Sequence, residues 1–351
     1  MDSVLESLID QVRQAHAQGH TLRIHGGHSK SFWVCAQAHQ PLDIRPCRGV
    51  VDYAPSELVL TVRAGTPLAE VEALLEAQGQ MLAFEPPYYG PTATIGGTLA
   101  CGLSGPRRAS AGSARDFVLG VRLIDGQGRD LSFGGQVIKN VAGFDVSRLM
   151  VGAFGSLGVI TEASLKVLPR PPFETTREWA LPEAVAIARM NEWAGQPLPI
   201  SATSFHQGRL RARLSGAEVA VQAAVTRLGG EEVPQGTAWW RSLREQTAAL
   251  FDTARPLWRL AVKSSAPPLG LSGSLLIEWG GALRWIASDH APAQIQKAAR
   301  DAQGHALLLR HGQPALPHFA TLDPVLMQIH KRLKYVFDPK EIFNPGLPGN
   351  F

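Results

Sequence analysis

Hydrophobic positions in the first half of the chain follow helix and strand periods in turn. Apolar residues three or four positions apart predict a helix over residues 3–18 that ends near Gly19. A second amphipathic pattern predicts a helix over 67–78, and a shorter one a helix over 145–151. Apolar runs between turn residues predict strands at 21–25, 42–44, 49–53, 58–62 and 159–167, and a hairpin of 118–125 with 130–133.

The clearest linker is Pro169-Arg170-Pro171-Pro172, and the pattern changes after it. Helices are expected at 183–193, 217–228 and 292–301, and strands at 202–206, 210–214, 258–262, 275–279 and 283–286. Such a mixture is typical of an α+β domain around an antiparallel sheet. The last stretch, 324–350, reads as a helix followed by turns.

Two glycine-rich segments about seventy residues apart carry the candidate chemistry. The first, Ile24 to Lys30, reads IHGGHSK and follows a predicted strand; the second, Pro91 to Gly105, reads PTATIGGTLACGLSG. Both combine missing side chains with hydroxyl and amide donors, which suits close wrapping of a backbone around phosphate oxygens. Two such loops favour a diphosphate held between two parts of one domain, so a dinucleotide is expected.

Composition narrows the class of protein. A chain of 351 residues with 45% hydrophobic content is long enough for two domains. No apolar run reaches the roughly 20 residues that cross a bilayer, and the N-terminus has no secretion-signal pattern. The three cysteines form no CxxC pair, which argues against iron–sulfur or zinc sites and fits a reducing cytoplasm. The net charge of +4 is too diffuse for nucleic acid but suits an anionic partner or membrane surface.

Further segments follow the glycine-rich pair in a fixed order: 112–120, 139–145 and 152–163. The whole set resembles the FAD-binding domain of the vanillyl-alcohol oxidase/p-cresol methylhydroxylase (PCMH) flavoprotein superfamily over residues 1–171. Residues 337–346 resemble the C-terminal signature of that group. Within it, chain length and motif wording resemble the FAD-binding E subunits of glycolate oxidase.

The resemblance implies an α+β fold in three parts. A PCMH-type FAD-binding domain would occupy 1–171, with subdomains of about 1–55 and 56–171. A second α+β domain, on the substrate or interface side, would occupy 172–320, and 321–351 would return to the flavin. The cofactor implied is FAD. Its expected contacts are Gly26, Gly27, His28, Ser29, Thr94, Ile95, Gly96, Gly97, Thr98, Gly102, Gly155, Gly158, Ile160 and Asn344.

Other interpretations of the glycines fit less well. A Walker A loop requires glycine directly before Lys-Ser, and a Rossmann fingerprint requires GxGxxG; neither is present, while plain turns remain an alternative. His28 leaves a question open. In several superfamily members a histidine after two loop glycines is bonded covalently to the flavin, whereas the glycolate oxidase subunits usually carry a small residue there and bind FAD without a bond.

Several other residues have two interpretations each. Arg107 and Arg108 are expected on an exposed loop near the cofactor, either receiving a carboxylate or simply solvated. The spacing of His305, His311 and His318 matches no metal site, so no metal is expected. Cys101 is expected to pack as a small hydrophobe. Trp239-Trp240 favours core packing, with an interface as the alternative.

One absence shapes the functional expectation. FAD-linked 2-hydroxy-acid dehydrogenases of the superfamily often carry His-x-Gly-Asp-Gly-Asn-x-His, and this sequence contains no such segment and no convincing base. The expectation is an FAD-binding subunit of a complex that oxidises glycolate, a 2-hydroxy acid. A sister FAD-dependent hydroxy-acid oxidase subunit would carry the chemistry, and an iron–sulfur subunit would pass electrons toward quinone.

That expectation places the protein in the cytoplasm, or peripherally on the inner face of the membrane through its partners. Two other classes stay open. One is a self-sufficient FAD-dependent hydroxy-acid or alcohol oxidoreductase. The other is a non-catalytic assembly subunit that keeps the fold.

Overall fold

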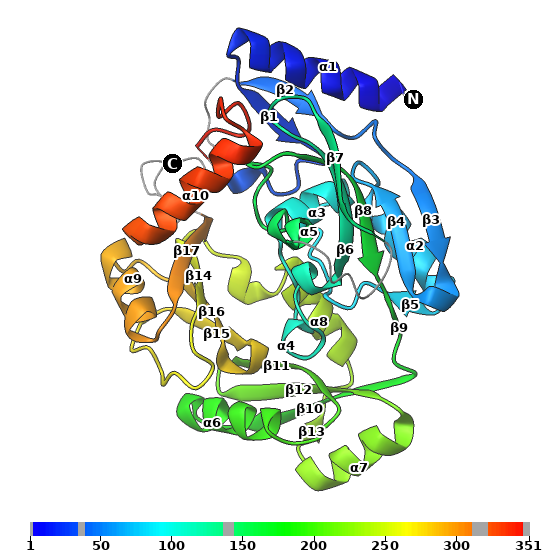
Figure 1. Cartoon of the computed structure of the whole chain (residues 1–351). Coiled ribbons are helices and arrows are strands. Elements are labelled where there is room, and N and C mark those ends of the chain that lie inside the picture. Colours follow the sequence, from blue (N-terminus) through cyan, green and yellow to red (C-terminus); the bar gives the residue numbers. More distant parts are fainter. Residues whose placement is uncertain (1–2, 34–38, 136–143, 311–321, 347–351) are drawn as a thin grey trace. The chain divides into compact units, whose positions relative to one another are not determined.

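The computed structural model describes residues 3–33, 39–135, 144–310 and 322–346. They divide into two compact units (Figure 1). Unit 1 comprises residues up to Ser104, Gly112–Arg170 and the chain from Leu322 onward; unit 2 comprises Gly105–Ala111 and Pro171–Thr321. Helices and antiparallel sheets occur in both units, which confirms the predicted α+β class.

The main sheet of unit 1 has five antiparallel strands in the order β3-β4-β8-β6-β7. The strands are β3 (Val50–Ala54), β4 (Val59–Arg63), β8 (Val159–Lys166), β6 (Val118–Ile124) and β7 (Asp130–Gly134). Leu60, Leu123 and Leu165 are fully buried in it. Burial of such side chains contributes about 1.5–3 kcal/mol each and holds the sheet together.

Two smaller sheets complete unit 1. One is the parallel pair β1 (Leu22–His25) and β2 (Gln40–Asp43), and the other pairs β5 (Gln80–Met81) with β9 (Leu168–Pro169). The helices of unit 1 are α1 (Ser3–Gln18), α2 (Leu68–Glu76), α3 (Ile95–Cys101), α5 (Val146–Leu149) and α10 (Pro324–Phe337). Short 3-10 turns occur at Ser31–Trp33, Pro55–Glu57 and Ala114–Phe117.

The second glycine-rich segment is not the continuous loop that the sequence predicts. Its central part, Ile95–Cys101, is helix α3, with the side chain of Thr94 as N-cap and Gly102 in the left-handed conformation after its last turn. A threonine before a short apolar stretch is a signal for the start of a helix, and a glycine after it is a signal for its end. The local sequence therefore accounts for helix α3.

Unit 2 is built on one eight-stranded sheet in the order β13-β10-β12-β11-β15-β16-β14-β17. The strands are β13 (Glu231–Glu232), β10 (Phe173–Ala180), β12 (Arg209–Gly216), β11 (Ile200–His206), β15 (Ser274–Glu278), β16 (Leu283–Ala287), β14 (Leu257–Ala261) and β17 (His305–Arg310). The helices are α4 (Arg108–Ala111), α6 (Glu183–Ala194), α7 (Glu218–Leu228), α8 (Gly236–Glu245) and α9 (Pro292–Asp301). Two 3-10 turns lie at Ala249–Phe251 and Trp279–Gly281.

Strands β10 and β17 and helix α8 are absent from the sequence-based expectation. Polar and charged residues dominate β10, which therefore shows no apolar run, although it forms an antiparallel ladder with β12 from Phe173 to Ala180. Trp240 on α8 is buried and donates from Nε1 to Thr176 Oγ1 at 2.9 Å. This tryptophan is therefore a core residue.

One boundary needs correction. Residues 105–111, expected within the first domain, cluster with unit 2. Arg107, expected to be exposed, is 8% exposed and pairs with Glu174 at 3.0 Å, while Arg108 lies 4.4 Å from the centre of the Trp279 ring. Trp279 Nε1 also donates to the carbonyl oxygen of Gly105 at 3.0 Å. These contacts attach the segment to unit 2. Across both units, no helix among the described residues is long and apolar enough to span a bilayer.

Candidate functional site

The first glycine-rich segment is the turn that follows β1. Parallel pairing with β2 sets Ile24 opposite Leu42 and His25 opposite Asp43, and the chain bends directly afterward. His28 within the bend has φ of 56°, a left-handed conformation uncommon for a residue with a side chain. Such strained positions concentrate at functional sites, so this bend marks a candidate.

The two glycine-rich segments touch each other. A Cβ at position 27 would lie 1.5 Å from the carbonyl oxygen of Thr92, and a Cβ at position 26 would lie 2.5 Å from Thr94 Oγ1. The hydroxyl of Thr92 donates to the carbonyl oxygen of Gly27. Because no side chain fits at these positions, both glycines are required for the bends to meet.

The start of α3 is held equally closely. Thr94 Oγ1 accepts a hydrogen bond from the Gly97 amide at 3.2 Å. A Cβ at position 96 would lie 2.7 Å from the Cβ of Ala64, at the end of β4. Gly96 therefore lets the helix lie against the end of β4, and Gly96 and Gly97 both present backbone, not side chains, to the pocket.

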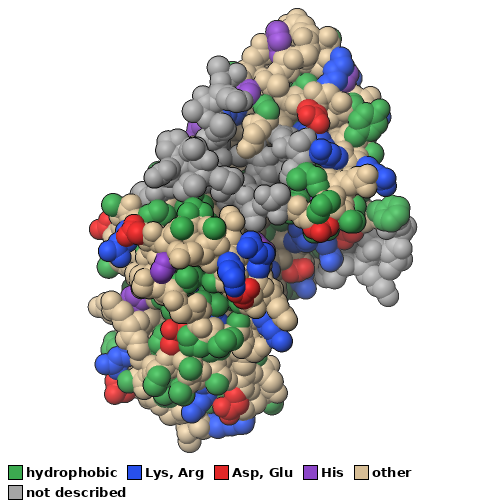
Figure 2. Space-filling model, turned by 90° about the vertical axis from the view of Figure 1, so that its left-hand side faces the viewer, with side chains coloured by type: hydrophobic (Ala, Val, Ile, Leu, Met, Phe, Trp, Pro, Cys, Tyr) green, Lys and Arg blue, Asp and Glu red, His purple; other side chains and the backbone are tan. Residues whose placement is uncertain are grey.

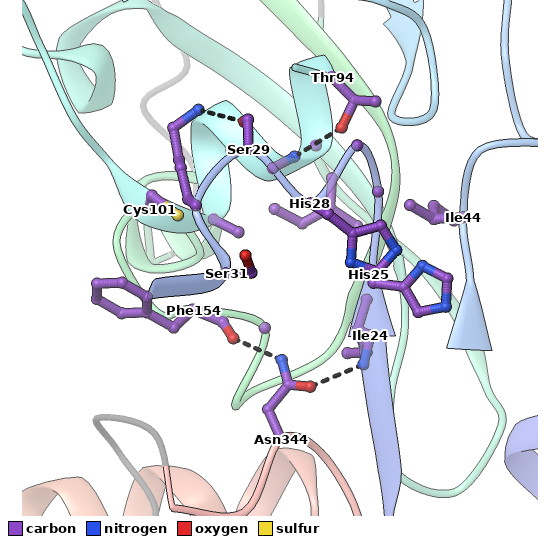
Figure 3. A pocket seen from close by; sticks show the side chains of 18 of the residues that line it. Ile24, His25, His28, Ser29, Ser31, Ile44, Thr94, Cys101, Phe154 and Asn344 are labelled. Atoms are coloured by element: carbon purple, nitrogen blue, oxygen red, sulfur yellow. Dashed lines mark hydrogen bonds between the residues drawn. The ribbon is translucent and has the colours of Figure 1, made fainter. Parts of the chain in front are cut away.

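A pocket opens where these segments meet (Figure 3). Among the predicted cofactor contacts, those that line it are Gly26, Gly27, His28, Ser29, Thr94, Gly96, Gly97, Gly155, Gly158, Ile160 and Asn344. Ile95, Thr98 and Gly102 are not among its lining residues. Ile95 and Thr98 are each 1% exposed, since the helical period turns them into the interior, and Gly102 follows the last turn of α3.

Further lining residues were not among the predicted cofactor contacts: Arg23, Ile24, His25, Lys30, Ser31, Ile44, Ala100, Cys101 and Phe154. Most follow from adjacency in the chain, because Arg23 to Ser31 is one continuous stretch through the end of β1 and the bend after it. Ala100 and Cys101 lie four residues after Gly96 and Gly97 and so continue the same face of α3. Ile44 could have been found from strand pairing, since it comes directly after β2, the partner of β1.

Asn344 joins two walls of the pocket, as Figure 3 shows. Its Oδ1 accepts from the Ile24 amide at 2.7 Å, and its Nδ2 donates to the Phe154 carbonyl oxygen at 2.7 Å. Asn344 and Phe154 both have positive φ, at 43° and 54°. The side chain thus ties β1 to the turn before Gly155, across 320 residues of sequence.

A buried ion pair supports the Asn344 segment. Lys334 on α10 is 2% exposed and contacts Asp338 at 2.8 Å. Lys334 Nζ also donates to the carbonyl oxygens of Ser156 at 2.7 Å and Phe343 at 3.3 Å. Asp338 accepts from the amides of Ile342 and Phe343. Burial lowers the pKa of Lys334, and the Asp338 carboxylate opposes that effect.

Two stacked histidines lie in the bend. The rings of His25 and His28 have centroids 4.5 Å apart and an interplanar angle of 27°. Burial lowers the pKa of His25, and the neighbouring His28 lowers it further, while Asp43, 3.8 Å from His25 Nδ1, acts in the opposite direction. Arg45 engages Asp43 and lowers the pKa of its carboxyl group. His25 is therefore biased toward the neutral form in the pocket.

Lys30 and Cys101 also line the pocket. Lys30 is 8% exposed, and its Nζ donates to the Tyr88 carbonyl oxygen and to Ser29 Oγ, each at 3.3 Å. Burial raises the pKa of Cys101 to about 11, which keeps the sulfur as a neutral thiol. Cys101 is therefore no nucleophile at neutral pH.

No three His, Cys, Asp or Glu side chains gather as metal ligands within the described ranges. Of the three histidines near the end of unit 2, only His305 belongs to those ranges; His311 and His318 lie outside them, as do residues 139–143 of the ordered motif set.

The chemistry of the lining fits FAD. Glycine backbone and small hydroxyl side chains suit a diphosphate, and Ile24, Ile44, Phe154 and Ile160 offer apolar surface to a flat ring. The direct contact of the two glycine-rich segments leaves the backbone of both exposed to one pocket. A bound dinucleotide needs such a combination of polar and apolar walls.

Comparison with known proteins supports this assignment. The profile of the family described as "FAD binding domain" matches residues 5–134. The chain is 49% identical to glycolate oxidase subunit GlcE of Escherichia coli strain K12 over 343 residues, which cover 97% of this chain and 96% of that protein. It is 33% identical to glycolate oxidase subunit GlcD of Bacillus subtilis strain 168 over 128 residues, or 36% of this chain and 27% of GlcD.

A solved structure of alkyldihydroxyacetonephosphate synthase shares the fold, with a TM-score of 0.68 at 16% identity, over 97% of this chain and 74% of that one. The cofactor that the FAD-binding domain takes is FAD. The near full-length similarity to the E. coli protein identifies the chain as a member of the GlcE family of glycolate oxidase subunits.

Proposed function

We propose that this chain is the FAD-binding subunit of a complex that oxidises glycolate to glyoxylate and passes the electrons through an iron–sulfur subunit toward quinone. The observation that carries the proposal is the convergence of both glycine-rich segments on one pocket, closed by Asn344. It occurs in a chain that is half identical to E. coli GlcE over almost its whole length.

The cofactor contacts are assigned from the lining. Main-chain amides of Gly26 to Ser29 and of Gly96 and Gly97 would hold the diphosphate, since fixed peptide dipoles neutralise an anion without bulky side chains. Gly155, Gly158, Ile160 and Asn344 would position the ring. The three predicted contacts that do not line the pocket are Ile95, Thr98 and Gly102. They would support the site by forming helix α3 and its end, and would not touch the cofactor. When bound, FAD supplies the two-electron acceptor, which can also return electrons singly.

The oxidation of the hydroxy acid itself is assigned to the sister FAD-dependent subunit. Oxidation of a 2-hydroxy acid requires a base for the hydroxyl proton and a cation for the carboxylate. The side chains of Arg107 and Arg108, candidates for the cation, contact Glu174 and Trp279 in unit 2. The sequence also lacks the histidine-rich catalytic segment of its superfamily relatives. In this complex the chain would receive and relay electrons, in the cytoplasm or at the inner membrane face.

Reconstitution tests this division of labour. The chain, the sister subunit and the complete complex are each assayed for glycolate-dependent reduction of an artificial acceptor and of a quinone. We expect the purified chain to carry FAD that glycolate does not bleach, and quinone reduction only by the complete complex. Rapid bleaching of the isolated chain would instead indicate a self-sufficient oxidoreductase. A chain that stays colourless after incubation with FAD would indicate an assembly subunit.

A second measurement tests whether FAD is bonded covalently to His28. Acid precipitation releases non-covalent FAD and leaves covalent flavin in the pellet. We expect a colourless pellet and free FAD in the supernatant, as in the glycolate oxidase subunits that the chain resembles. A yellow pellet that turns colourless in His28→Ala would show that His28 forms the bond.

A further inference from the structure

Two imidazole rings lie against each other in the pocket. His25 is the last residue of β1, His28 belongs to the bend after it, and both line the pocket. Their ring centroids are 4.5 Å apart, and Figure 3 shows both side chains at the bend. Gly26 and Gly27 alone separate the two residues in the chain, so the rings belong to the bend whose amides are assigned to the FAD diphosphate. We call the two stacked rings the His25–His28 pair.

One nitrogen of the pair has no hydrogen bond. His25 Nδ1 is buried and finds no hydrogen-bond partner within the described ranges. Asp43 Oδ1 lies 3.8 Å from it, because parallel pairing of β1 with β2 sets His25 opposite Asp43. A charged imidazole carries a proton on both nitrogens, whereas a neutral one carries a proton on one. Protonation therefore makes His25 the ion-pair partner of a carboxylate.

The surroundings of His25 nevertheless keep the ring neutral in the apoprotein. Burial lowers the pKa of His25 most, His28 lowers it further, Asp43 raises it and Arg45 lowers it. Arg45 also engages Asp43 at 2.6 Å, which weakens the attraction of that carboxylate for the ring. A further negative charge is therefore needed before the proton binds at neutral pH.

The rest of the pocket supplies no such charge. Its described lining contains no Asp or Glu, and its permanent cations are Arg23 and Lys30. Helix α3 adds the thiol of Cys101, which stays neutral because burial raises its pKa to about 11. The segment from Phe154 to Ile160 adds no titratable side chain, and Asn344 adds an uncharged amide. The groups of this lining that titrate near neutral pH are therefore the two imidazoles.

A diphosphate brings the negative charge. We propose that the His25–His28 pair takes up one proton from solvent when FAD binds, and that FAD therefore binds more tightly as the pH falls. This inference rests on the proposed function, which places the diphosphate at the bend. A dianion close to the rings favours their charged form, and it also offsets the cations that oppose protonation. One proton is expected and not two, because charged rings with centroids 4.5 Å apart repel each other.

Calorimetry counts the proton. Apoprotein is titrated with FAD at about pH 7 in two buffers of different ionisation enthalpy, and the difference between the observed heats gives the protons taken up per FAD bound. FAD itself takes up none, since its diphosphate diester is fully ionised at this pH. We expect at least about 0.3 proton per FAD. Between the pKa of the apoprotein and that of the complex, FAD affinity should fall by as much as about tenfold per pH unit.

Matched variants locate the proton. His25→Gln and His28→Gln each replace an imidazole by an uncharged amide, so each should reduce the proton uptake to about half or less. Both should weaken FAD binding more at pH 6 than at pH 8, whereas a loss of packing alone weakens it equally at both. Other histidines are scattered over the surface, as Figure 2 shows for one face. The control His206→Gln therefore removes an imidazole from β11 in unit 2 and should leave the uptake unaltered.

Nuclear magnetic resonance of the unaltered chain tests the same proposal even where a variant fails to bind FAD. Imidazole carbon shifts report each histidine pKa in the apoprotein and in the complex, and the apoproteins of the variants assign the signals. We expect the pKa of one member of the pair to rise by at least about 0.5 when FAD binds. Absence of that rise, or proton uptake that persists in both variants or is lost in His206→Gln, overturns the proposal and leaves the FAD site standing. A chain that binds no FAD at any pH overturns the cofactor site as well.

Discussion

Each unit contains a buried cation, an asparagine that hydrogen-bonds to main-chain groups of other segments, and glycines pressed against neighbouring main chain. In unit 1 these groups line or support the pocket described above. In unit 2, Arg284 is 0% exposed and donates to the carbonyl oxygens of Ala266, Pro267 and Gly281. Asn191 donates to the carbonyls of Ser264 and Gly280. The two units use similar hydrogen bonds from buried or half-buried side chains to the main chain. They differ in the segments held, which border the pocket in unit 1 and do not line it in unit 2. Matched substitutions in the two units therefore separate ligand binding from stability.

The largest effect is expected from the glycine contacts. Gly27→Ala should lower FAD affinity at least about a hundredfold, because the two glycine-rich segments must separate to admit a methyl group 1.5 Å from the Thr92 oxygen. In unit 2, Gly304→Ala places a Cβ 2.0 Å from the Ala261 oxygen. It should lower the unfolding temperature and leave FAD affinity intact. Fluorescence titration of each apoprotein with FAD measures the two affinities. Equal losses of FAD affinity in Gly27→Ala and Gly304→Ala would contradict the expected difference between the units.

The buried cations come next. Lys334→Met leaves the Asp338 carboxylate without its cation, so it should cost about 3–5 kcal/mol in unfolding free energy. It should also speed FAD release, since the contacts to Ser156 and Phe343 are lost. Arg284→Met removes donors from carbonyl groups and should cost less, about 1–3 kcal/mol. Urea unfolding and stopped-flow FAD release test both; faster FAD release in Arg284→Met would contradict the separation.

The asparagine pair should give a smaller effect. Asn344→Ala loses hydrogen bonds to Ile24 and Phe154 and should weaken FAD binding about tenfold. Asn191→Ala loses a similar set in unit 2 and serves as the control. We expect it to lower stability alone. Isothermal titration of each apoprotein with FAD gives the affinities. An unaltered FAD affinity in Asn344→Ala would show that β1 and the turn before Gly155 stay together without the hydrogen bonds of Asn344.

The smallest effect concerns pH. The folded-state pKa of His25 lies below its ordinary value of 6.5. Between those two values the unfolded chain binds more protons, so unfolding free energy falls as pH drops below 6.5. His25→Gln should remove less than about 1 kcal/mol of that pH dependence. Urea unfolding of apoprotein at pH 5 and pH 7 measures it. If the slope of the variant equals that of the unaltered chain, His25 does not titrate as inferred.

The fold follows from sequence wherever a segment is apolar and periodic. Helix α9 lies at Pro292–Asp301, the range predicted, and β8 and the β6–β7 hairpin lie within a residue or two of theirs. Strand β10 could not be found this way, because its stability comes from its ladder with β12 and not from an apolar run. A local sequence pattern does not reveal which distant strand will pair with such a segment.

The pocket shows the same limit. The bend at Gly26 and Gly27 is local and was expected from sequence. The second glycine-rich segment was expected to be a loop, and the capping signals of Thr94 and Gly102 were missed, so the helix that turns Ile95 and Thr98 inward was not predicted. Nor did the sequence show that Arg107 pairs with Glu174, since the partner lies 67 residues away. Asn344 was placed at the flavin by resemblance, and its role as a clamp became visible only with its hydrogen bonds.

The hydrogen bonds of Asn344 also bear on when during synthesis the protein can bind its cofactor. The Leu22 amide donates to the Ile342 carbonyl oxygen, and Phe343 bridges in parallel to Leu22, so the last part of the chain completes structure begun by the first. During synthesis, the glycine bends emerge from the ribosome long before their final wall exists. A newly made chain therefore lacks one wall of the pocket until the segment around Asn344 has been synthesised, and we expect full FAD affinity only from that point on.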